Sequence, residues 1–355
     1  MQIPIDPTSS SRLDVDAVRS GKLTNVPSDH MFLAEFAHNE WRKSRIQGYR
    51  PIPMSPLALG MQYAQSVFEG MKAYRFEDDR IGIFRLQRHA QRFNRSLQRM
   101  LMPEVPTDMF EAALRTLVDL DRQWVPAGPE STMYIRPYVF ATEERVGLKP
   151  AEEFLFMVLT APFKPNFPRP LKVKIERGYV RAAPGGTGAA KCAGNYAAAM
   201  YATQIAKDEG YDQVLWTDAL THSTIEESGA MNVMFVVKGA LVTPPLSDTI
   251  LDGVTRDSLL ILAREMGLTV EERAVTVQEL KDGIASGDVS EAFGCGTAAI
   301  VTPIGEIGID GEDYALKSPD ESMMLRLKTA LNDIRFGRVE DRHGWMTIVD
   351  QVSST

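Results

Sequence analysis

Cysteine and histidine are scarce in this chain of 355 residues, which has two cysteines and five histidines. The two cysteines, Cys192 and Cys295, are too few to build a disulfide framework. The histidines form no group with the spacing of metal ligands. These shortages argue against a disulfide-stabilised fold and against metal-dependent catalysis.

The chain also lacks an excess of positive charge and a long apolar run. Its formal net charge is −8, whereas nucleic acids and anionic membranes attract surfaces with a positive field. No apolar run approaches the roughly 20 residues that a membrane-spanning helix needs, and no charged-then-apolar leader opens the chain. We therefore expect a cytoplasmic protein that acts on small molecules, without nucleic-acid or membrane partners.

Length and apolar content are sufficient for two domains, because 44% of the residues are hydrophobic. A cluster of four prolines between Pro162 and Pro170 indicates a boundary. We predict a smaller N-terminal domain at 1–161 with a loosely held N-terminal arm, a Pro-rich linker at 162–171 and a larger C-terminal domain at 172–355. Strands and helices are interspersed in both halves, which indicates an α/β fold of mixed type.

The apolar patterns predict several elements on either side of this boundary. Strands are expected at 81–84, 133–141, 154–161, 173–176, 213–217, 232–237 and 240–242. Helices are expected at 86–100, 108–124, 196–210 and 253–267. Two tight turns are expected as well, one carrying Glu226 and Glu227 and one at 292–299.

The stretch from Gly185 to Tyr196 surrounds Lys191 with small residues and ends at Asn195, a good N-cap for the helix that follows. Three interpretations apply to it. It could be a Gly-rich surface loop with an exposed lysine. A nucleotide P-loop would need Gly before the lysine and Ser or Thr after it, where this chain has Ala190 and Cys192. The third interpretation is a lysine that forms a Schiff base with a carbonyl cofactor.

A phosphorylated carbonyl cofactor needs partners elsewhere in the chain. Arg92 could supply a cation, and the helix start at Thr255 and the turn at Thr297 could supply N–H groups and hydroxyls. Glu226 or Glu227 could pair with a ring nitrogen, and the residues alone do not choose between them. Each of these features is common by itself, as a cap, a surface charge or a solvated turn.

An ordered set of motifs runs through nearly the whole chain. Together they resemble the branched-chain amino-acid aminotransferases of the fold-type IV pyridoxal-phosphate family. The motifs are Ser28–Met31, Phe68–Tyr74, Phe84-Arg85 with Arg92, Tyr134–Pro137, Gly185–Tyr196, Val214–Trp216, Thr243–Leu246, Gly253–Arg256 and Gly296–Ala298. The family's pattern is broken at Gln62, Ala193, Ser228 and Cys295.

The resemblance implies a pyridoxal 5′-phosphate cofactor with Lys191 as the Schiff-base lysine, Glu227 at the pyridine nitrogen and Tyr196 at the ring hydroxyl oxygen. It implies that the phosphate is bound by Arg92, Val254, Thr255 and Thr297. It also implies a substrate side lined by Phe68, Tyr134, Arg136, Thr297 and Ala298. Tyr63 would reach in from a neighbouring subunit, which implies a homodimer. The redox cysteine pair of some relatives is replaced by Ala299 and Thr302.

The implied reaction is the reversible, ping-pong transfer of an amino group between L-leucine, L-isoleucine or L-valine and 2-oxoglutarate. Two alternatives remain at this point. One is another enzyme of the same fold, a D-amino-acid aminotransferase or an aminodeoxychorismate lyase. The other is a nucleotide-binding module that uses the loop from Gly185 to Lys191.

Overall fold

The computed structural model describes residues 3–128, 130–165, 169–316 and 321–351, which divide into two compact units. Unit 1 consists of Met1–Pro165, Ala190–Ala193 and Asp333–Thr355, and unit 2 of Asn166–Ala189 and Gly194–Asn332. The segment that carries Lys191 and the C-terminal residues thus group with unit 1. The sequence-based limits at 1–161, 162–171 and 172–355 stay a prediction, and residues 166–168 of the linker lie outside the described residues.

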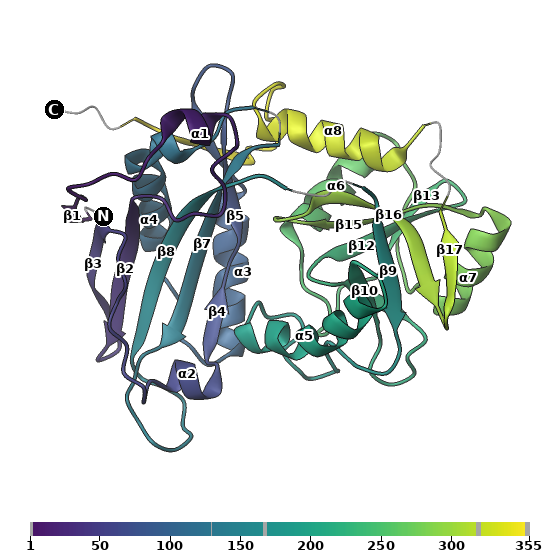
Figure 1. Ribbon diagram of the computed structural model, residues 1–355, viewed down its shortest axis with the longest axis horizontal. Coiled ribbons are helices and arrows are strands. Elements are labelled where there is room, and N and C mark those ends of the chain that lie inside the picture. Colours follow the sequence, from purple (N-terminus) through teal and green to yellow (C-terminus); the bar gives the residue numbers. More distant parts are fainter. Residues whose placement is uncertain (1–2, 129, 166–168, 317–320, 352–355) are drawn as a thin grey trace. The chain divides into compact units, whose positions relative to one another are not determined.

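Unit 1 is organised around one nine-stranded sheet with the order β1-β3-β2-β8-β7-β5-β6-β18, to which β4 adds by pairing with β7 (Figure 1). The first of these pairs, β1 with β3, is parallel, and the others are antiparallel. The strands are β1 (Ile5–Asp6), β2 (His30–Ala37), β3 (Glu40–Gly48), β4 (Ser66–Phe68), β5 (Met71–Arg75), β6 (Ile81–Phe84), β7 (Thr132–Ala141), β8 (Phe154–Phe163) and β18 (Met346–Val349).

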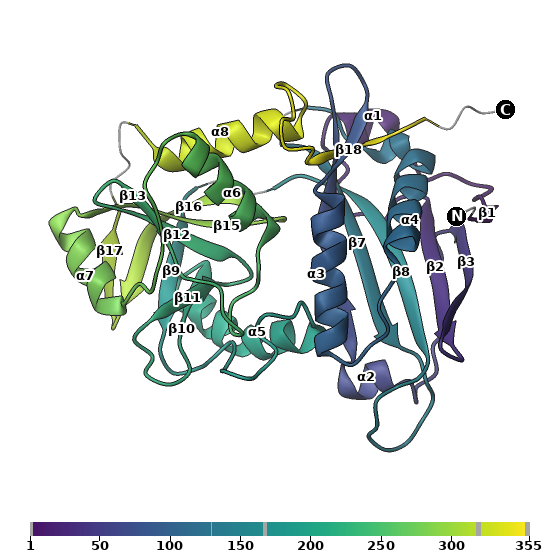
Figure 2. The same ribbon diagram turned by 180° about the vertical axis from the view of Figure 1, so that it is seen from behind.

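Two long helices cover one face of this sheet, α3 (Leu86–Arg99) and α4 (Thr107–Leu120), as Figure 2 shows. Phe93 of α3 lies 5.6 Å from Phe110 of α4 and 5.9 Å from Phe156 of β8, measured between ring centroids. These rings are fully buried and form the centre of the unit 1 core. Short helical segments complete the unit: α1 (Val15–Arg19), α2 (Leu59–Tyr63) and the 3₁₀ helix η1 (Arg122–Trp124).

The other face of the sheet carries Tyr134 and Arg136 of β7. Along β7, Met133 and Ile135 point into the core, so the alternating residues Tyr134 and Arg136 lie on the opposite face. In the N-terminal region, β1 pairs with β3, and Ser11 and Arg12 contact the Asp29 carboxylate. These contacts attach Ile5–Asp6 and Ser11-Arg12 to the rest of unit 1, and the loosely held arm as a whole stays a prediction.

Unit 2 contains a second nine-stranded sheet, of order β11-β10-β9-β16-β15-β12-β13-β14, with β17 paired to β16. The strands are β9 (Leu171–Glu176), β10 (Gln213–Thr217), β11 (Ile225–Ser228), β12 (Asn232–Val237), β13 (Ala240–Thr243), β14 (Val270–Glu272), β15 (Val289–Gly296), β16 (Ile300–Ile309) and β17 (Glu312–Ala315). The helices are α5 (Ala193–Asp208), α6 (Val254–Glu265), α7 (Val277–Ser286) and α8 (Met323–Arg335), of which α8 ends in unit 1.

Helices pack on both faces of this sheet, as the core contacts of strand β10 show. Leu215 joins the core that includes Val277 and Leu280 of α7. The neighbouring residues Val214 and Trp216 instead pack against Ala202 and Ala206 of α5. Since side chains alternate along a strand, α5 and α7 lie on opposite faces. None of the described helices is long and apolar enough to span a membrane.

Candidate active site

Lys191 lies in a segment that is tied to unit 1 through its backbone. Its N–H donates to Ser96 Oγ at 3.0 Å, and its carbonyl accepts from the Phe68 N–H at 3.1 Å. The next residue, Cys192, forms an isolated bridge with Val67 of β4. The Lys191 Nζ atom is 5.0 Å from the centre of the Phe68 ring. The interpretation as an exposed lysine on a surface loop is therefore wrong, since Lys191 is partly buried between α3 and β4.

Arg92 belongs to a buried charge cluster that also contains Glu69 and His89. Its Nη2 atom lies 2.6 Å from Glu69 Oε1, and its Nε lies 3.2 Å from Glu69 Oε2. The His89 Nδ1 atom lies 2.6 Å from Glu69 Oε2. Burial lowers the pKa of His89 against the opposing effect of Glu69, so the imidazole is neutral at pH 7 and Nδ1–H donates.

Glu69 is fully buried and carries the only negative charge of this cluster among its described members. Burial alone would raise the pKa of Glu69, but the charge of Arg92 and the hydrogen bond from His89 outweigh it and lower the pKa to about 2. The field of Lys191 acts in the same direction. Glu69 therefore stays ionised at neutral pH and fixes the orientation of the Arg92 guanidinium. Sequence reasoning missed Glu69 and His89, although His89 and Arg92 are three residues apart on a predicted helix.

Phe68, Tyr134 and Arg136 form an aromatic and cationic group on the open face of the unit 1 sheet. The Arg136 guanidinium carbon lies 4.7 Å from the Phe68 ring centre and 5.1 Å from that of Tyr134. Arg136 Nη2 donates to the Tyr134 hydroxyl at 2.9 Å. The Tyr134 ring lies against Gly70, where an added Cβ would be 2.2 Å from the hydroxyl oxygen. Gly70 is therefore required for this ring position.

Tyr63 is placed at the C-terminal end of α2, where 44% of it is exposed. The unit 1 part of the predicted site thus consists of Lys191, Phe68, Tyr134, Arg136 and the Arg92 cluster.

In unit 2, Glu226 and Glu227 lie side by side in strand β11 and are both buried. The expectation that they occupy a turn is wrong, because Gly229 and Ala230 form the turn one residue later. Glu227 Oε1 accepts from the Leu251 N–H at 2.6 Å and from Asn232 Nδ2 at 3.1 Å. The Arg181 Nε atom lies 3.4 Å from Glu227 Oε2. Two hydrogen bonds and the Arg181 cation thus favour the ionised carboxylate of Glu227.

Glu226 has a different environment. Its Oε1 atom accepts from the Thr249 hydroxyl at 2.6 Å, and its Oε2 atom has no hydrogen-bond partner among the described residues. Burial raises the pKa of Glu226, and the hydrogen bond from Thr249 opposes this effect only in part. The two neighbouring carboxylates are thus distinguished by their donors.

Val254 and Thr255 open α6, and both are buried. Asn232 connects this helix start with Glu227, because its Nδ2 group also donates to the Leu251 carbonyl at 2.9 Å. Gly253 precedes the helix, and an added Cβ there would lie 1.8 Å from Asn232 Oδ1. The close approach of α6 to Asn232 thus depends on glycine. Sequence reasoning missed Asn232 and Arg181, for which only the structure gives a signal.

Two expectations for unit 2 need correction. Asn195 is not the N-cap of α5, which begins at Ala193; it exchanges two hydrogen bonds with Thr187, at 2.7 and 2.8 Å. The small-residue segment 292–299 is not one turn, since β15 continues to Gly296 and pairs there with Ile300. Thr297 and Ala298 lie in the three-residue loop between β15 and β16. The remaining predicted residue, Tyr196, lies half-buried in the first turn of α5.

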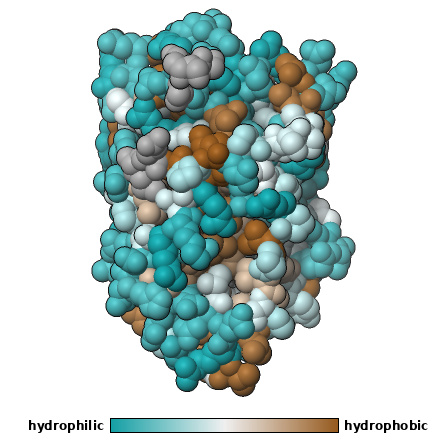
Figure 3. Space-filling view, turned by 90° about the vertical axis from the view of Figure 1, so that its left-hand side faces the viewer, coloured by the Kyte–Doolittle hydropathy of each residue, from teal (hydrophilic) through white to brown (hydrophobic). Residues whose placement is uncertain are grey.

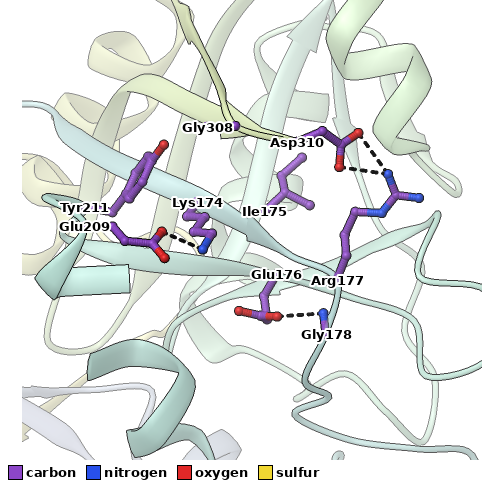
Figure 4. A pocket seen from close by; sticks show the side chains of 10 residues that line it. Lys174, Ile175, Glu176, Arg177, Gly178, Glu209, Tyr211, Gly308 and Asp310 are labelled. Atoms are coloured by element: carbon purple, nitrogen blue, oxygen red, sulfur yellow. Dashed lines mark hydrogen bonds and ion pairs between the residues drawn. The ribbon is translucent and has the colours of Figure 1, made fainter. Parts of the chain in front are cut away.

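A surface pocket of about 420 Å³ in unit 2 does not belong to these residues (Figure 4). Its charged side chains are already paired: Lys174 with Glu209 at 2.5 Å, and Arg177 with both carboxylate oxygens of Asp310 at 3.0 Å. No group of three or more His, Cys, Asp or Glu side chains within the described ranges could hold a metal ion. Within the described residues, neither this pocket nor a metal-binding cluster therefore offers an alternative catalytic centre.

The predicted residues of each unit thus form coherent groups, and comparison with known proteins identifies their class. Residues 66–307 match the amino-transferase class IV family, and the chain belongs to that family. Its relatives include branched-chain-amino-acid aminotransferases from Mycobacterium tuberculosis, 42% identical over 90% of this chain and 89% of the relative, and from Bacillus subtilis, 40% identical over 90% and 91%.

Solved structures give the same result. The branched-chain amino acid aminotransferase from Escherichia coli aligns with a TM-score of 0.74 at 25% identity, over 91% of this chain and 99% of that one. The branched-chain amino acid aminotransferase from Thermobaculum terrenum, in its PLP-bound holo form, aligns with a TM-score of 0.73 at 25% identity, over 90% and 98%. The fold is therefore that of the fold-type IV aminotransferases.

Proposed function

We propose that this protein is a pyridoxal-phosphate-dependent aminotransferase that moves amino groups between L-leucine, L-isoleucine or L-valine and 2-oxoglutarate. The relatives named above support this choice over a D-amino-acid aminotransferase or an aminodeoxychorismate lyase. The single structural observation that carries it is the position of Lys191, held by its backbone beside Phe68 and close to the field of the Glu69–Arg92 pair.

The residues present suit this cofactor. A phosphate needs a permanent cation, hydroxyls and backbone N–H groups, and Arg92, Thr255 and the start of α6 have these properties. A protonated pyridine nitrogen needs an ionised carboxylate, and Glu227 is the one with two hydrogen-bond donors and the Arg181 cation beside it. We assign Val254 and Thr297 to the phosphate as well, and Tyr196 to the ring hydroxyl. The domain limits given above belong to the same proposal.

When bound, pyridoxal phosphate supplies an aldehyde that takes up the amino group and a ring that accepts the electron pair released at Cα. Lys191 carries the proton between the substrate Cα atom and the cofactor's C4′ atom. Glu227 holds the proton on the ring nitrogen, which keeps the ring electron-poor. Phe68 and Tyr134 contact the aliphatic side chain, and Thr297 and Ala298 offer backbone N–H groups to the substrate.

We further propose a cytoplasmic homodimer in which Tyr63 serves the partner's site. Apolar side chains interrupt a mostly hydrophilic surface in Figure 3. In unit 1, α2 and the loop after β7 are joined by backbone hydrogen bonds, from Leu59 to Glu143 and from Arg145 to Leu57. Large apolar side chains are exposed there: Leu57 (41%), Met61 (66%), Tyr63 (44%), Val146 (80%) and Leu148 (79%). Such a patch supports a protein interface.

The absorbance spectrum of the purified, cofactor-loaded protein tests the proposal. We expect the visible band of the lysine-bound cofactor to disappear on addition of L-leucine and to return with 2-oxoglutarate. D-alanine should leave the band unchanged. A response to D-alanine but not to L-leucine would favour the alternative enzymes, and tight ATP binding without any visible band would favour a nucleotide-binding module.

A further inference from the structure

Lys72 is a buried lysine without a partner in the part of unit 1 that the structure describes. It lies in β5 and is 2% exposed, and its Nζ atom makes no hydrogen bond to any described residue. The Nζ atom sits 4.6 Å from the centre of the Phe163 ring. Burying a polar group without a hydrogen-bond partner carries a free-energy cost of several kcal/mol. The structure therefore shows a buried amino group whose loss of hydration is not offset by a hydrogen bond to any described residue.

The position of Lys72 on the sheet brings it to the substrate-side group. In the β5–β7 pairing, Lys72 lies opposite Tyr134 and Met71 opposite Ile135, so the register continues to Gly70 opposite Arg136. Lys72 and Arg136 are consequently diagonal neighbours on the same face of the sheet. The Tyr134 ring lies beside both, and its centroid is 5.8 Å from that of the Phe163 ring that faces Lys72.

Arg136 shares the incomplete environment of Lys72. Its Nη2 group donates to the Tyr134 hydroxyl, whereas its buried Nε atom has no hydrogen-bond partner among the described residues. Neither Lys72 nor Arg136 forms an ion pair with a described carboxylate. Two basic side chains thus adjoin one aromatic surface, and among the described residues no carboxylate forms an ion pair with either. An anion at this position would compensate both.

We propose that Lys72 determines specificity by binding, together with Arg136, the side-chain carboxylate of the acidic co-substrate, glutamate or 2-oxoglutarate. This rests on the proposed function, because it assigns a recognition group to its second half-reaction. An aliphatic substrate has no charge at this point and contacts the Phe68 and Tyr134 rings instead. Lys72 is distinct from Arg136 in that its amine can lose its proton while the site holds an aliphatic side chain.

The environment of Lys72 favours that neutral form. Burial lowers the pKa of Lys72 well below the usual lysine range, the Arg335 cation lowers it further, and Glu130 opposes them. A bound carboxylate favours the protonated amine, so the acidic substrate takes up a proton when it binds above the pKa of the free protein. Its affinity therefore falls as the pH rises. Binding of an aliphatic substrate is not coupled to this proton.

A matched pair of unreactive acids tests the proposal with the cofactor-loaded full chain. Glutarate and 4-methylvalerate share one carboxylate and differ at the other end, where only glutarate is charged. Isothermal titration calorimetry in two buffers with different ionisation enthalpies gives both the affinity and the number of protons taken up. The variants are Lys72→Met, which removes the charge, and Lys72→Arg, which keeps it at every pH.

We expect Lys72→Met to weaken glutarate about 30-fold or more and 4-methylvalerate less than about threefold. Lys72→Arg should keep the glutarate affinity within about fivefold and abolish its proton uptake. Equal losses for both acids in Lys72→Met, or unchanged proton uptake in Lys72→Arg, would overturn the proposal. The proposed function has a separate test: it is wrong if the visible absorbance band of the wild-type protein does not respond to L-leucine.

Discussion

Two groups of charged residues in unit 1 differ in whether their charges are paired with partners from the protein itself. In the Glu69 cluster, both carboxylate oxygens meet donors from Arg92 and His89, and every member is buried. In the Lys72–Arg136 group, the Lys72 Nζ and Arg136 Nε atoms have no hydrogen-bond partner among the described residues, although the charge of Glu130 acts on Lys72. The first arrangement is complete within the protein itself. The second becomes complete only with a ligand, which is why we regard it as a recognition site, and Glu69 and His89 as the groups that hold Arg92 in place.

The largest effect on turnover is expected from replacing Lys191, whose Nζ atom lies beside the Phe68 ring and whose charge acts on Glu69. Lys191→Ala should abolish turnover yet still allow the cofactor to bind, because Arg92, Thr255 and Glu227 are unchanged. Equilibrium dialysis of the cofactor separates the two effects. Borohydride reduction of the wild type, followed by peptide mapping, should label Lys191 alone. A label on Lys72 or any other lysine would show that the central assignment is wrong.

Breaking the compensated cluster should destabilise the fold. Glu69→Gln leaves the buried Arg92 cation without its counter-charge, and we expect a loss of about 3–5 kcal/mol in the free energy of unfolding. Urea unfolding followed by tryptophan fluorescence measures it. Asp78→Asn, which breaks the exposed ion pair with Arg80, is the control and should change the unfolding midpoint far less. Similar changes in both variants would remove the distinction.

Glu69 also predicts a dependence of stability on pH. Its pKa is about 2 in the folded protein and 4.5 in the reference state, so its contribution is fully present above pH 4.5. About 3 kcal/mol should be lost as the pH falls from 4.5 towards 2. Urea midpoints across this range should show a smaller loss for Glu69→Gln than for the wild type.

Removing a cation from the uncompensated group should change specificity and not stability. We expect Arg136→Met to weaken kcat/KM for glutamate and 2-oxoglutarate by about 2–5 kcal/mol and that for leucine by less than about 1 kcal/mol. Leucine does not need the charge, since it is bound by apolar contact. Equal losses for both substrates would mean that Arg136 only supports its strand.

The same contrast exists between the two carboxylates of β11. Glu227→Gln should lower kcat by about 10²-fold, because an amide cannot hold the proton on the ring nitrogen. Glu226→Gln should have little effect, since Glu226 has only the Thr249 donor and an amide can accept that bond. Steady-state assays of both variants measure the difference. Comparable losses in the two would leave the assignment of Glu227 unsupported.

The smallest effect is expected from oxidation. Cys192 and Cys295 are both buried, and Ala299 and Thr302 occupy the places of the redox pair of some relatives. Mild peroxide treatment should therefore leave turnover nearly unchanged. Inactivation that a thiol reductant reverses would contradict this prediction.

Much of the fold could be predicted from local sequence. The strands at Ile81–Phe84, Gln213–Thr217 and Asn232–Val237 have their predicted bounds, because short apolar runs there are limited by turn residues. The strands expected at 232–237 and 240–242 pair with each other as an antiparallel hairpin, β12–β13. Local patterns failed where polar residues are buried. Glu226 and Glu227 are expected in a turn because Ser228 and Gly229 follow them, yet both are buried in β11.

The site shows the same limit. The predicted residues came from motifs. The residues that support them act through contacts between distant segments, which local sequence does not show: Glu69, His89, Asn232 and Arg181. Asn232, for example, acts on Leu251 and Gly253, which follow it by about twenty residues. Lys72 lies in the Phe68–Tyr74 motif, yet only its burial and its lack of a hydrogen-bond partner among the described residues show that it differs from an ordinary strand lysine.

The last strand of the chain has a consequence for biosynthesis. β18 (Met346–Val349) pairs with β6 (Ile81–Phe84), whose four residues are all buried. A ribosome makes these partners more than 250 residues apart, so the apolar β6 stays unpaired along one side until residues 346–349 have been made. An open strand of this kind can pair with other nascent chains. The protein therefore depends on protection of that strand during translation, and truncations that remove β18 should collect in the insoluble fraction.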